Sequence, residues 1–251
     1  MNVAVVDIGN TSISYGLATG SRVIRASQVA VERHGRRGIR GMLATLSRGR
    51  RVHGAVCGSV VPARTADWLA GLREISESRP IEVTHRLKLG IRIAYPRPGT
   101  IGADRLANAC GAAARYGTPV IVADFGTALT FDVLAGGGVY AGGIIAPGLP
   151  LMTDYLAERT ALLPRLRLRK VQRRVGKSTV EAMCIGARFG YRGMVREVIE
   201  TLSAEPGLAG AALCATGGFA RWVLEDLDLP FAFDPNLTLF GLGRIFELNT
   251  E

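Results

Sequence analysis

The sequence predicts an α/β protein made of two similar halves, each a mixed sheet covered by helices. Two short phrases carry this prediction: Asp7-Ile-Gly-Asn-Thr11 and Asp124-Phe-Gly-Thr127. Each follows an apolar run rich in β-branched residues, at 3–6 and at 120–123, as a buried strand would be. After a helix-breaking segment at 116–119, the order of strand and helix patterns begins again. A repeated order of elements indicates a duplicated fold.

The first expected half, 1–116, opens with three strand patterns and continues with alternating helix and strand patterns. The turn Thr19-Gly-Ser21 joins two of these strands, and Pro62 lies in the first turn of a helix, where proline is tolerated. The predicted strands span residues 3–7, 12–17, 23–29, 54–58 and 81–84, and the predicted helices span residues 38–47, 62–76 and 103–115.

The second expected half, 117–251, repeats the opening of three strands. The glycine triplet Gly136-Gly-Gly138 joins the second and third of them, as in a tight turn. The predicted strands span residues 120–124, 129–134, 139–145 and 211–215, and the predicted helices span residues 149–161, 178–202, 219–227 and 238–248.

The chain is strongly basic, with a net charge of +10 and an isoelectric point of about 10.1. A basic chain suggests nucleic-acid binding, but only three of the 31 basic residues are lysines, a skew that a GC-rich coding bias also produces. In the densest cluster, Arg165, Arg167 and Arg169 alternate with Leu166 and Leu168, which predicts an edge strand with one solvated face. A polyanion-facing surface is the alternative for this strand, and nucleic acid is not an expected partner.

The composition is that of a cytoplasmic enzyme. A hydrophobic content of 48% over 251 residues is enough to build a substantial core. The uncharged stretch at 133–153 contains too many glycines and prolines for a transmembrane helix, so no membrane association is expected. The four cysteines are scattered without the spacing of a metal site and are expected to be reduced, partly buried thiols.

The two repeated phrases have the composition of phosphate-binding loops. Asp7, at the carboxyl end of a strand, can hold Mg²⁺, and Gly9 lets a phosphate approach the backbone. Thr11 and the neighbouring amides can donate hydrogen bonds to phosphate oxygens. Asp124 and Thr127 offer the same groups from the second half. The alternative for either loop is an ordinary tight turn with an Asx cap.

Two further segments suit a nucleotide and an acceptor. Leu213-Cys-Ala-Thr-Gly-Gly218 is an apolar strand that ends in paired glycines before a helix, a turn that can admit a base or ribose. In Gly102-Ala-Asp104-Arg105, Asp104 opens a helix whose dipole stabilises its charge, and Arg105 offers a planar fork for an anion. The alternatives are a common glycine turn and a surface ion pair.

Taken together, these motifs resemble type III pantothenate kinases. The matching segments, in order, are Asp7-Ile-Gly-Asn-Thr11, Tyr95-Pro-x-Pro98, Gly102-Ala-Asp-Arg105, Asp124-Phe-Gly-Thr-Ala128, Gly142-Gly-Ile-Ile-Ala-Pro-Gly148, Gly176-Lys-Ser-Thr179, Ala215-Thr-Gly-Gly218 and Asp234-Pro-x-Leu-Thr238. The resemblance implies the acetate and sugar kinase, Hsp70 and actin fold, with two ribonuclease-H-like halves and a cleft between them. It also implies ATP-dependent phosphorylation of pantothenate, the first step of coenzyme A synthesis, by a homodimer.

The resemblance also implies a role for each motif residue. ATP, with its Mg²⁺, would be held by Asp7, Ile8, Gly9, Asn10, Thr11, Ser12, Ile13, Ser14 and Thr127. The acceptor pocket would be lined by Tyr95, Gly102, Ala103, Asp104, Arg105 and Thr179. Asp104 would be the general base, and Asp124 would bind a monovalent cation, K⁺ or NH₄⁺, whereas the residues alone assign Asp124 to Mg²⁺.

Two positions depart from the family pattern. Leu129 stands where a threonine is usual, so a hydroxyl near the phosphates or the ion is expected to be missing. Cys57-Gly58 replaces the commoner Ser-Ser and could alter a loop near the site. With the high basicity, these departures keep two alternatives open: a related phosphotransferase with another small acceptor, and a catalytically weak regulatory or nucleic-acid-associated paralogue.

Overall fold

The protein contains two mixed β-sheets. The structure, a computed structural model, describes residues 1–31 and 34–250. The strands are β1 (Val3–Ile8), β2 (Ser12–Thr19), β3 (Arg22–Ala30), β4 (Gly54–Ser59), β5 (Ile81–Glu82), β6 (Arg92–Ile93), β7 (Val120–Phe125), β8 (Ala128–Ala135), β9 (Val139–Pro147), β10 (Ala212–Thr216) and β11 (Phe231–Phe233). The helices are α1 (Arg36–Ser47), α2 (Pro62–Ile75), η1 (Pro98–Thr100), α3 (Ala103–Tyr116), α4 (Leu149–Arg159), α5 (Thr179–Ser203), α6 (Ala220–Leu224) and α7 (Leu237–Leu248).

The strand order confirms the predicted duplicated fold. The first sheet runs β3-β2-β1-β4-β5, and the second runs β11-β10-β7-β8-β9-β6. Read from β9 to β11, the second sheet repeats the order of the first, with β7 in the place of β1. β4 pairs parallel to β1, and β10 pairs parallel to β7, so the equivalent crossovers are also repeated.

The chain forms two compact units. The first unit comprises residues 1–118, 132–142 and 236–251, and the second comprises residues 119–131 and 143–235. The first unit thus gains the C-terminal helix α7 and the adjoining ends of β8 and β9. The expected halves, 1–116 and 117–251, were defined by the repeated order of elements and not by compactness. This division remains a prediction.

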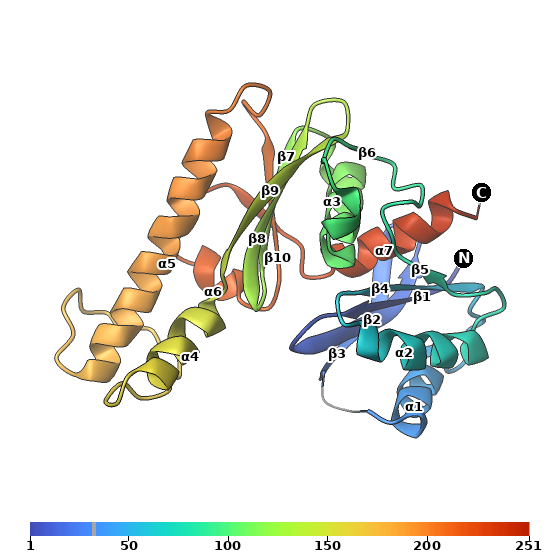
Figure 1. Ribbon diagram of the computed structural model, residues 1–251, viewed down its shortest axis with the longest axis horizontal. Helices are drawn as coiled ribbons and strands as arrows, with labels where there is room; N and C mark the ends of the chain where they lie inside the picture. The colour runs from blue at the N-terminus through green and yellow to red at the C-terminus, as the bar shows by residue number, and fades with distance from the viewer. Residues whose placement is uncertain (32–33, 251) are drawn as a thin grey trace. The chain divides into compact units, whose positions relative to one another are not determined.

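Helices cover both faces of the sheet in the first unit, with α1 and α2 on one side and α3 and α7 on the other (Figure 1). The helices α1 and α2 contribute buried side chains to the core of this unit, and these are Ile39, Leu43, Trp68 and Leu72. On the other face, α7 packs closely on α3 because it has Gly241 at the contact, where a side chain would overlap the backbone of α3.

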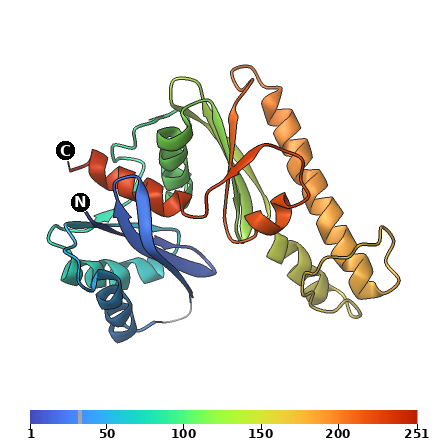
Figure 2. The ribbon, with the colours of Figure 1, turned by 180° about the vertical axis from the view of Figure 1, so that it is seen from behind.

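The core of the second unit lies between β7, β8 and β10 and the long helix α5. Tyr191, Val195 and Ile199 come from successive turns of α5 and are buried against Phe125 and Phe131. Figure 2 shows the length of α5 beside the sheet, with the short helix α6 on the same side.

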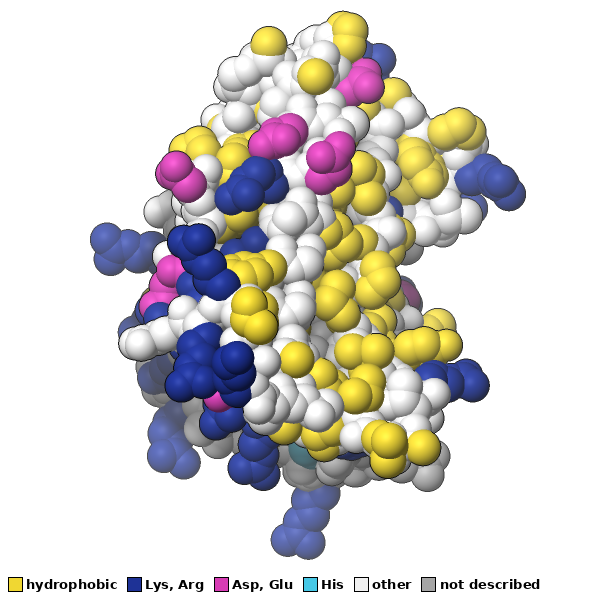
Figure 3. Space-filling view, turned by 90° about the vertical axis from the view of Figure 1, so that its left-hand side faces the viewer, with side chains coloured by type: hydrophobic (Ala, Val, Ile, Leu, Met, Phe, Trp, Pro, Cys, Tyr) yellow, Lys and Arg dark blue, Asp and Glu magenta, His cyan; other side chains and the backbone are white. Residues whose placement is uncertain are grey.

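An apolar surface remains exposed on the second unit, and Figure 3 shows hydrophobic side chains gathered on the face that carries α4 and α5. The exposed large hydrophobic side chains of the second unit come from the end of β9, from α4, from the segment before α5 and from α5. They are Ile145, Leu151, Tyr155, Leu156, Leu162, Val175 and Phe189, of which Leu162 is 90% exposed.

The predicted arginine-rich edge strand is wrong: residues 160–178 contain no strand. Burial does alternate along the segment, because Leu166 and Leu168 pack against the core of the second unit. The alternating residues Arg165, Arg167 and Arg169 are exposed. An extended chain can bury alternate residues without a neighbouring strand, and no sheet edge receives this segment.

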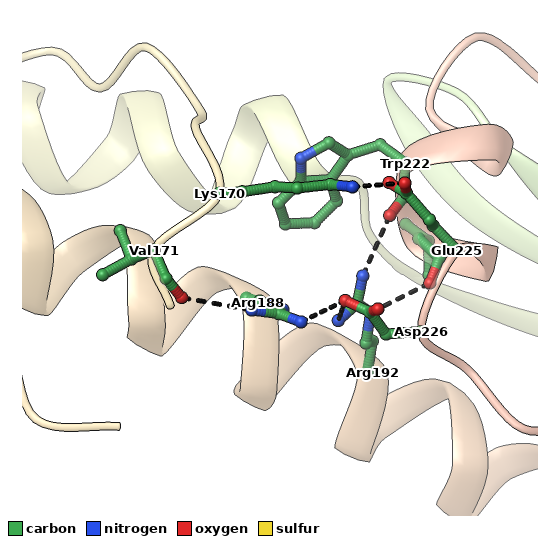
Figure 4. Close-up of polar contacts among 8 residues, drawn as sticks. Lys170, Val171, Arg188, Arg192, Trp222, Glu225 and Asp226 are labelled. Carbon is green, nitrogen blue, oxygen red and sulfur yellow. Dashed lines mark hydrogen bonds and ion pairs between the residues drawn. The ribbon is translucent and has the colours of Figure 1, made fainter. Parts of the chain in front are cut away.

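An ion pair and a hydrogen bond connect residues 170 and 171 of this segment to the end of α6 and to α5 (Figure 4). Lys170 pairs with Glu225 at the end of α6, and the Arg188 side chain of α5 donates to the carbonyl of Val171 at 3.2 Å. Arg188 and Arg192 both pair with Asp226. Lys170, Arg188 and Arg192 therefore have acidic or carbonyl partners within the second unit. These contacts do not involve Arg165, Arg167 and Arg169, so they do not test the polyanion alternative.

Most predicted elements are confirmed within a few residues, but β6, β11 and η1 were not predicted. Each is only two or three residues long, too short for a periodic pattern. The four cysteines are buried thiols. In residues 1–31 and 34–250, no helix is long and apolar enough to cross a membrane.

Candidate active site

The first predicted phosphate loop is a tight hairpin between β1 and β2. Asp7 lies opposite Ser14 in the antiparallel pair, and the Gly9 amide donates to the Ser12 carbonyl at 3.0 Å. A Cβ on Gly9 would approach that carbonyl oxygen to 3.1 Å, so glycine permits the turn. The hydroxyls of Ser12 and Ser14 accept hydrogen bonds from Gln28 at 3.0 and 3.3 Å.

The residues of this loop divide by burial. Ile8 and Ile13 are buried in the core of the first unit, so only their backbone can contact a ligand. Asn10 and Thr11 are exposed at the tip, and Asp7 is half-buried at the end of the strand. The accessible polar groups of this loop therefore lie at the tip of the hairpin and at the carboxyl end of β1.

Gly58 stands beside both the first loop and the start of α3. It pairs with Asp7 across the parallel strands β1 and β4. A Cβ on Gly58 would lie 3.5 Å from the Ala103 Cβ, 3.8 Å from the Asp7 carboxylate and 3.1 Å from Leu242. This departure from the family pattern therefore leaves the space beside Asp7 open. Its neighbour Cys57 is buried, and burial raises the pKa of its thiol.

Asp104 occupies the first turn of α3, which begins after Gly102. Its carboxylate turns back and accepts the Arg105 amide at 2.8 Å. A side chain on Gly102 would overlap that carboxylate and push it aside, so glycine leaves room for Asp104 in this position. Burial raises the pKa of Asp104, while the amide and charge of Arg105 oppose the shift. A carboxylate of raised basicity at a helix N-terminus has the properties of a general base.

A cavity of about 570 Å³ opens on the first unit beside Gly102 and Ala103. It is large enough for a small organic acceptor. Its remaining lining residues are Ser59, Val60, Val83, Thr84, His85, Arg86, Gly99, Thr100 and Ile101. The wall thus combines apolar side chains with hydroxyl and cationic groups next to the residue that precedes Asp104.

A buried network behind Asp104 connects two residues predicted to line the acceptor pocket. The Arg105 Nε donates to Asp132 Oδ1 at 2.7 Å, and the Tyr140 hydroxyl donates to the same oxygen at 2.8 Å. The Tyr140 ring packs edge-on against Tyr95, with centroids 6.4 Å apart. The structure therefore brings Tyr95, Asp104 and Arg105 together through Asp132 and Tyr140.

Sequence reasoning missed Asp132 and Tyr140. Asp132 is fully buried on β8, and burial raises its pKa to about 7 although Arg105 and Tyr140 oppose the shift. A carboxylate inside the otherwise apolar run 131–134 was the available signal, because such a residue needs a partner. The sequence did not indicate that its partner would be Arg105.

The second predicted phosphate loop follows β7. Asp124 lies beside Thr216 in the parallel pair of β7 and β10. Gly217 has a φ of +93°, and a Cβ there would lie 2.6 Å from the Asp124 carboxylate and from the backbone of Phe125. Likewise a side chain on Gly148 would overlap the Thr127 carbonyl. Gly217 and Gly148 therefore pack directly against the loop, where a side chain would displace the Asp124 carboxylate or the Thr127 backbone.

Thr179 is the exposed first residue of α5. The helix start is capped, because the Ser178 hydroxyl accepts the Glu181 amide at 3.2 Å and the Glu181 carboxylate accepts the Lys177 amide at 2.8 Å. Gly176 lets the incoming chain pass close to the backbone of Ala182.

The predicted site residues fall into two groups. The first unit contains residues 7–14, Tyr95 and residues 102–105, and the second contains Asp124, Thr127 and Thr179. No group of three or more potential protein ligands for a metal occurs in the part of the chain that the structure describes. The single carboxylates Asp7 and Asp124 fit an ion that receives its other ligands from a substrate or from the backbone.

The expectation that Leu129 removes a hydroxyl from the phosphate site is not supported by its position. Leu129 is fully buried in the core of the second unit with Phe131. Ala128 and Thr130, on the other face of β8, are only half-buried. The substitution of Leu129 for threonine therefore changes core packing.

We expect Leu129→Thr to destabilise the protein by roughly 2–5 kcal/mol, the range for truncating a buried leucine, with the buried hydroxyl as a further cost. Turnover per folded molecule should not rise. Thermal unfolding and steady-state kinetics on the same preparation test this. If the variant had a higher turnover and an unchanged stability, residue 129 would contribute to the phosphate site after all.

Comparisons of the sequence with known proteins point to one family. The family model described as type III pantothenate kinase matches residues 3–201. A protein named type III pantothenate kinase from Agathobacter rectalis is 34% identical over 251 residues, covering 98% of this chain and 96% of that protein. One of the same name from Akkermansia muciniphila is 51% identical over 162 residues, covering 64% of this chain and 66% of that protein.

A solved structure supports the fold alone. It is a putative 2-dehydro-3-deoxygalactonokinase from Sinorhizobium meliloti, 15% identical, with a TM-score of 0.57 over 98% of this chain and 96% of that one. The predicted fold class, the duplicated α/β fold of sugar kinases and actin-like ATPases, is therefore confirmed.

Proposed function

This chain belongs to the type III pantothenate kinase family, and from that premise we propose how its own residues carry out the reaction. The enzyme uses ATP to phosphorylate pantothenate in coenzyme A biosynthesis. The observation that carries the assignment is the family match over residues 3–201, which includes both predicted phosphate loops and the Asp104 turn.

Asp104 is the proposed general base. It orients the primary hydroxyl of pantothenate and accepts its proton as the oxygen attacks the terminal phosphate of ATP. Its raised pKa and its place at the start of α3 support this role, because a base of higher pKa is a better proton acceptor provided that it is ionised at the working pH. The cavity beside Gly102 provides room for an acceptor next to this carboxylate.

The acceptor residues are proposed to be Tyr95, Gly102, Ala103, Arg105 and Thr179. Arg105 is the only cation among them, so it would bind the pantothenate carboxylate. Gly102 and Ala103 border the cavity with their backbone, and Tyr95 supplies an aromatic wall that is 37% exposed. Thr179 would donate from the exposed start of α5.

ATP is proposed to bind through the loop of residues 7–14 in the first unit and through Thr127 in the second. Asp7 would hold Mg²⁺ together with the phosphates, and the amides around Gly9 and Thr11 would donate to phosphate oxygens. When bound, Mg²⁺ neutralises charge on the phosphates, the contribution on which phosphoryl transfer chiefly depends. The open tip at Asn10 and Thr11 supports this role.

Asp124 is proposed to hold K⁺ or NH₄⁺. The close packing of Gly217 fixes this carboxylate beside the backbone of Phe125, which supports an ion that takes further oxygens from the backbone. We expect Asp124→Asn to abolish the stimulation of turnover by potassium over sodium, measured at equal ionic strength. If the variant kept the potassium dependence of the wild type, the ion would be bound elsewhere.

A homodimer is proposed to form through the apolar face of the second unit (Figure 3). Ile145, Tyr155 and Phe189 are each about half exposed or more there, and an apolar patch rimmed by charge is typical of a protein interface. Sedimentation of the wild type and of Phe189→Asp tests the proposal. A monomeric wild type would contradict it, and an unchanged dimer in the variant would exclude this face.

The activity itself is tested by ADP release with ATP, Mg²⁺ and pantothenate, in potassium and again in sodium. Turnover that requires both pantothenate and potassium is the expected result. ADP release that does not depend on pantothenate would favour a related phosphotransferase with another acceptor. Absence of turnover in a folded protein would favour the regulatory alternative.

A further inference from the structure

The most deeply buried charge in the first unit is the carboxylate of Asp132. It is 0% exposed, on a strand whose neighbouring residues are apolar. One of its oxygens, Oδ1, accepts both Arg105 Nε and the Tyr140 hydroxyl, whereas Oδ2 is buried without a hydrogen-bond partner among the described residues. Both donors thus converge on a single atom.

The Arg105 guanidinium is only partly used by this contact. Its side chain is 12% exposed, and Nε is the atom that faces Asp132. Its Nη2 is buried and has no partner within the described chain. A guanidinium presents its N–H groups in a fixed fork, so once Nε is held the direction of the remaining N–H groups is set. An unpartnered, buried N–H edge is completed by an anion such as a carboxylate.

The same carboxylate also reaches the aromatic part of the proposed pocket. Tyr140 is fully buried, and its hydroxyl is held by Asp132 while its ring packs edge-on against Tyr95. Tyr95 in turn packs within 3.6 Å of the position that a Cβ on Gly142 would occupy. Movement of Asp132 would therefore alter both the cation and the aromatic wall.

We propose that Asp132 and Tyr140 are positioning residues, which aim the free N–H edge of Arg105 at the carboxylate of the acceptor and so select an acidic acceptor over a neutral one. This inference rests on the proposed role of Arg105 in the acceptor pocket. Asp132 and Tyr140 act through Arg105, and the pantothenate hydroxyl that reacts is assigned to Asp104.

Stability alone is a weak reason for such a network. A buried ion pair is often no more stabilising than apolar residues of the same volume, because both charges lose their hydration. Here two polar atoms, Asp132 Oδ2 and Arg105 Nη2, in addition have no partner among the residues that the structure describes, which costs further free energy. The network has an explanation if its function is to position the Arg105 guanidinium for the carboxylate of the acceptor.

The test compares two acceptors. Pantothenate has a carboxylate at its end, and pantothenol has a primary hydroxyl in the same place. The measured quantity is the ratio of kcat/KM for the acid to kcat/KM for the alcohol, with the KM for ATP recorded in parallel. Because each tenfold change in this ratio is about 1.4 kcal/mol of discrimination, misaligning one charged contact should be readily visible.

We expect Asp132→Asn, which preserves the size of the side chain, to lower this ratio by about tenfold or more. The change should appear chiefly as a higher KM for pantothenate, with the KM for ATP unchanged. Tyr140→Phe removes only one donor and should produce a smaller shift in the same direction. This second variant also keeps the proposal testable if Asp132→Asn fails to fold.

Two comparisons separate positioning from a structural role. Asp226→Asn breaks another arginine–aspartate network, that of Arg188 and Arg192 in the second unit. It should lower stability and leave the acid-to-alcohol ratio at the wild-type value. Arg105→Met should abolish the preference, and adding Asp132→Asn to it should cause no further loss, because Asp132 acts through Arg105.

The outcomes distinguish this inference from the proposed acceptor contact. If Arg105→Met keeps the preference for the acid, the contact between Arg105 and the acceptor is wrong, and the inference is overturned with it. If Arg105→Met loses the preference while Asp132→Asn and Tyr140→Phe change only the melting temperature, the contact stands and the positioning role is overturned.

Discussion

Replacing Asp104 with asparagine should lower kcat by at least about tenfold, since general-base help is typically worth about 10²–10⁴-fold. Asparagine has the shape of aspartate and can still accept the Arg105 amide, but it cannot take a proton from the pantothenate hydroxyl. The binding of ATP should be close to normal, because its proposed contacts lie in residues 7–14 and Thr127. Steady-state kinetics with direct nucleotide binding measures both quantities.

The pH dependence of the wild type should carry the same signature. Asp104 must be ionised to act as a base, so kcat/KM falls as the pH drops through its pKa. Since burial raises that pKa, the acid limb should lie at a higher pH than for an ordinary aspartate, and Asp104→Asn should lack it. A limb of unchanged position in the variant would assign the titration to another group.

The loss of turnover should not come from unfolding. A carboxyl with a raised pKa in the folded state favours the neutral form, so its contribution to stability is present at low pH and is lost as the pH rises through that pKa. Asparagine, which is always neutral, should keep or raise the melting temperature near pH 7. Asp67→Asn, an exposed change on α2, is the control for loss of one charge. Unchanged kcat in Asp104→Asn would exclude Asp104 as the base.

Replacing Gly217 with alanine should damage the second of the proposed phosphate loops severely. The backbone there has a φ of +93°, and the new Cβ would lie 2.6 Å from the Asp124 carboxylate and from the backbone of Phe125. Strain of this kind costs roughly 1–3 kcal/mol, and the displaced carboxylate should lower potassium-stimulated turnover by about tenfold or more, because shifts of about 1 Å have large kinetic effects.

The neighbouring glycine provides a matched control. A Cβ on Gly218 would have no heavy atom of the described chain within 4 Å, and the φ of Gly218 is not in the left-handed region. Gly218→Ala should therefore keep both the melting temperature and the potassium response of the wild type. Comparable losses in the two variants would mean that the turn as a whole, and not the space beside Asp124, governs the site.

The regular parts of the fold were readable from the sequence because each rests on a local pattern. The strands β1 and β7 are runs of buried β-branched residues, and α3 begins at a glycine followed by an acidic first turn. The edge strand predicted at 165–174 is wrong because an alternation of period two indicates alternate burial, and it does not indicate whether a neighbouring strand is present.

For the candidate site too, some features were predictable from the sequence and others required the tertiary structure. The sequence by itself predicted the duplicated α/β fold, which is confirmed, and it supplied the proposals of two phosphate loops and of Asp104 as the base, since all of these consist of contiguous residues whose chemistry and spacing are visible along the chain. Only the tertiary structure decided that Leu129 lies in the core and that Gly217 closes on Asp124. It alone also joined Arg105 to Asp132, 27 residues away. The physical reason is that burial and hydrogen-bond partners depend on which strands and helices meet, and a pattern along the chain contains no record of residues distant in sequence.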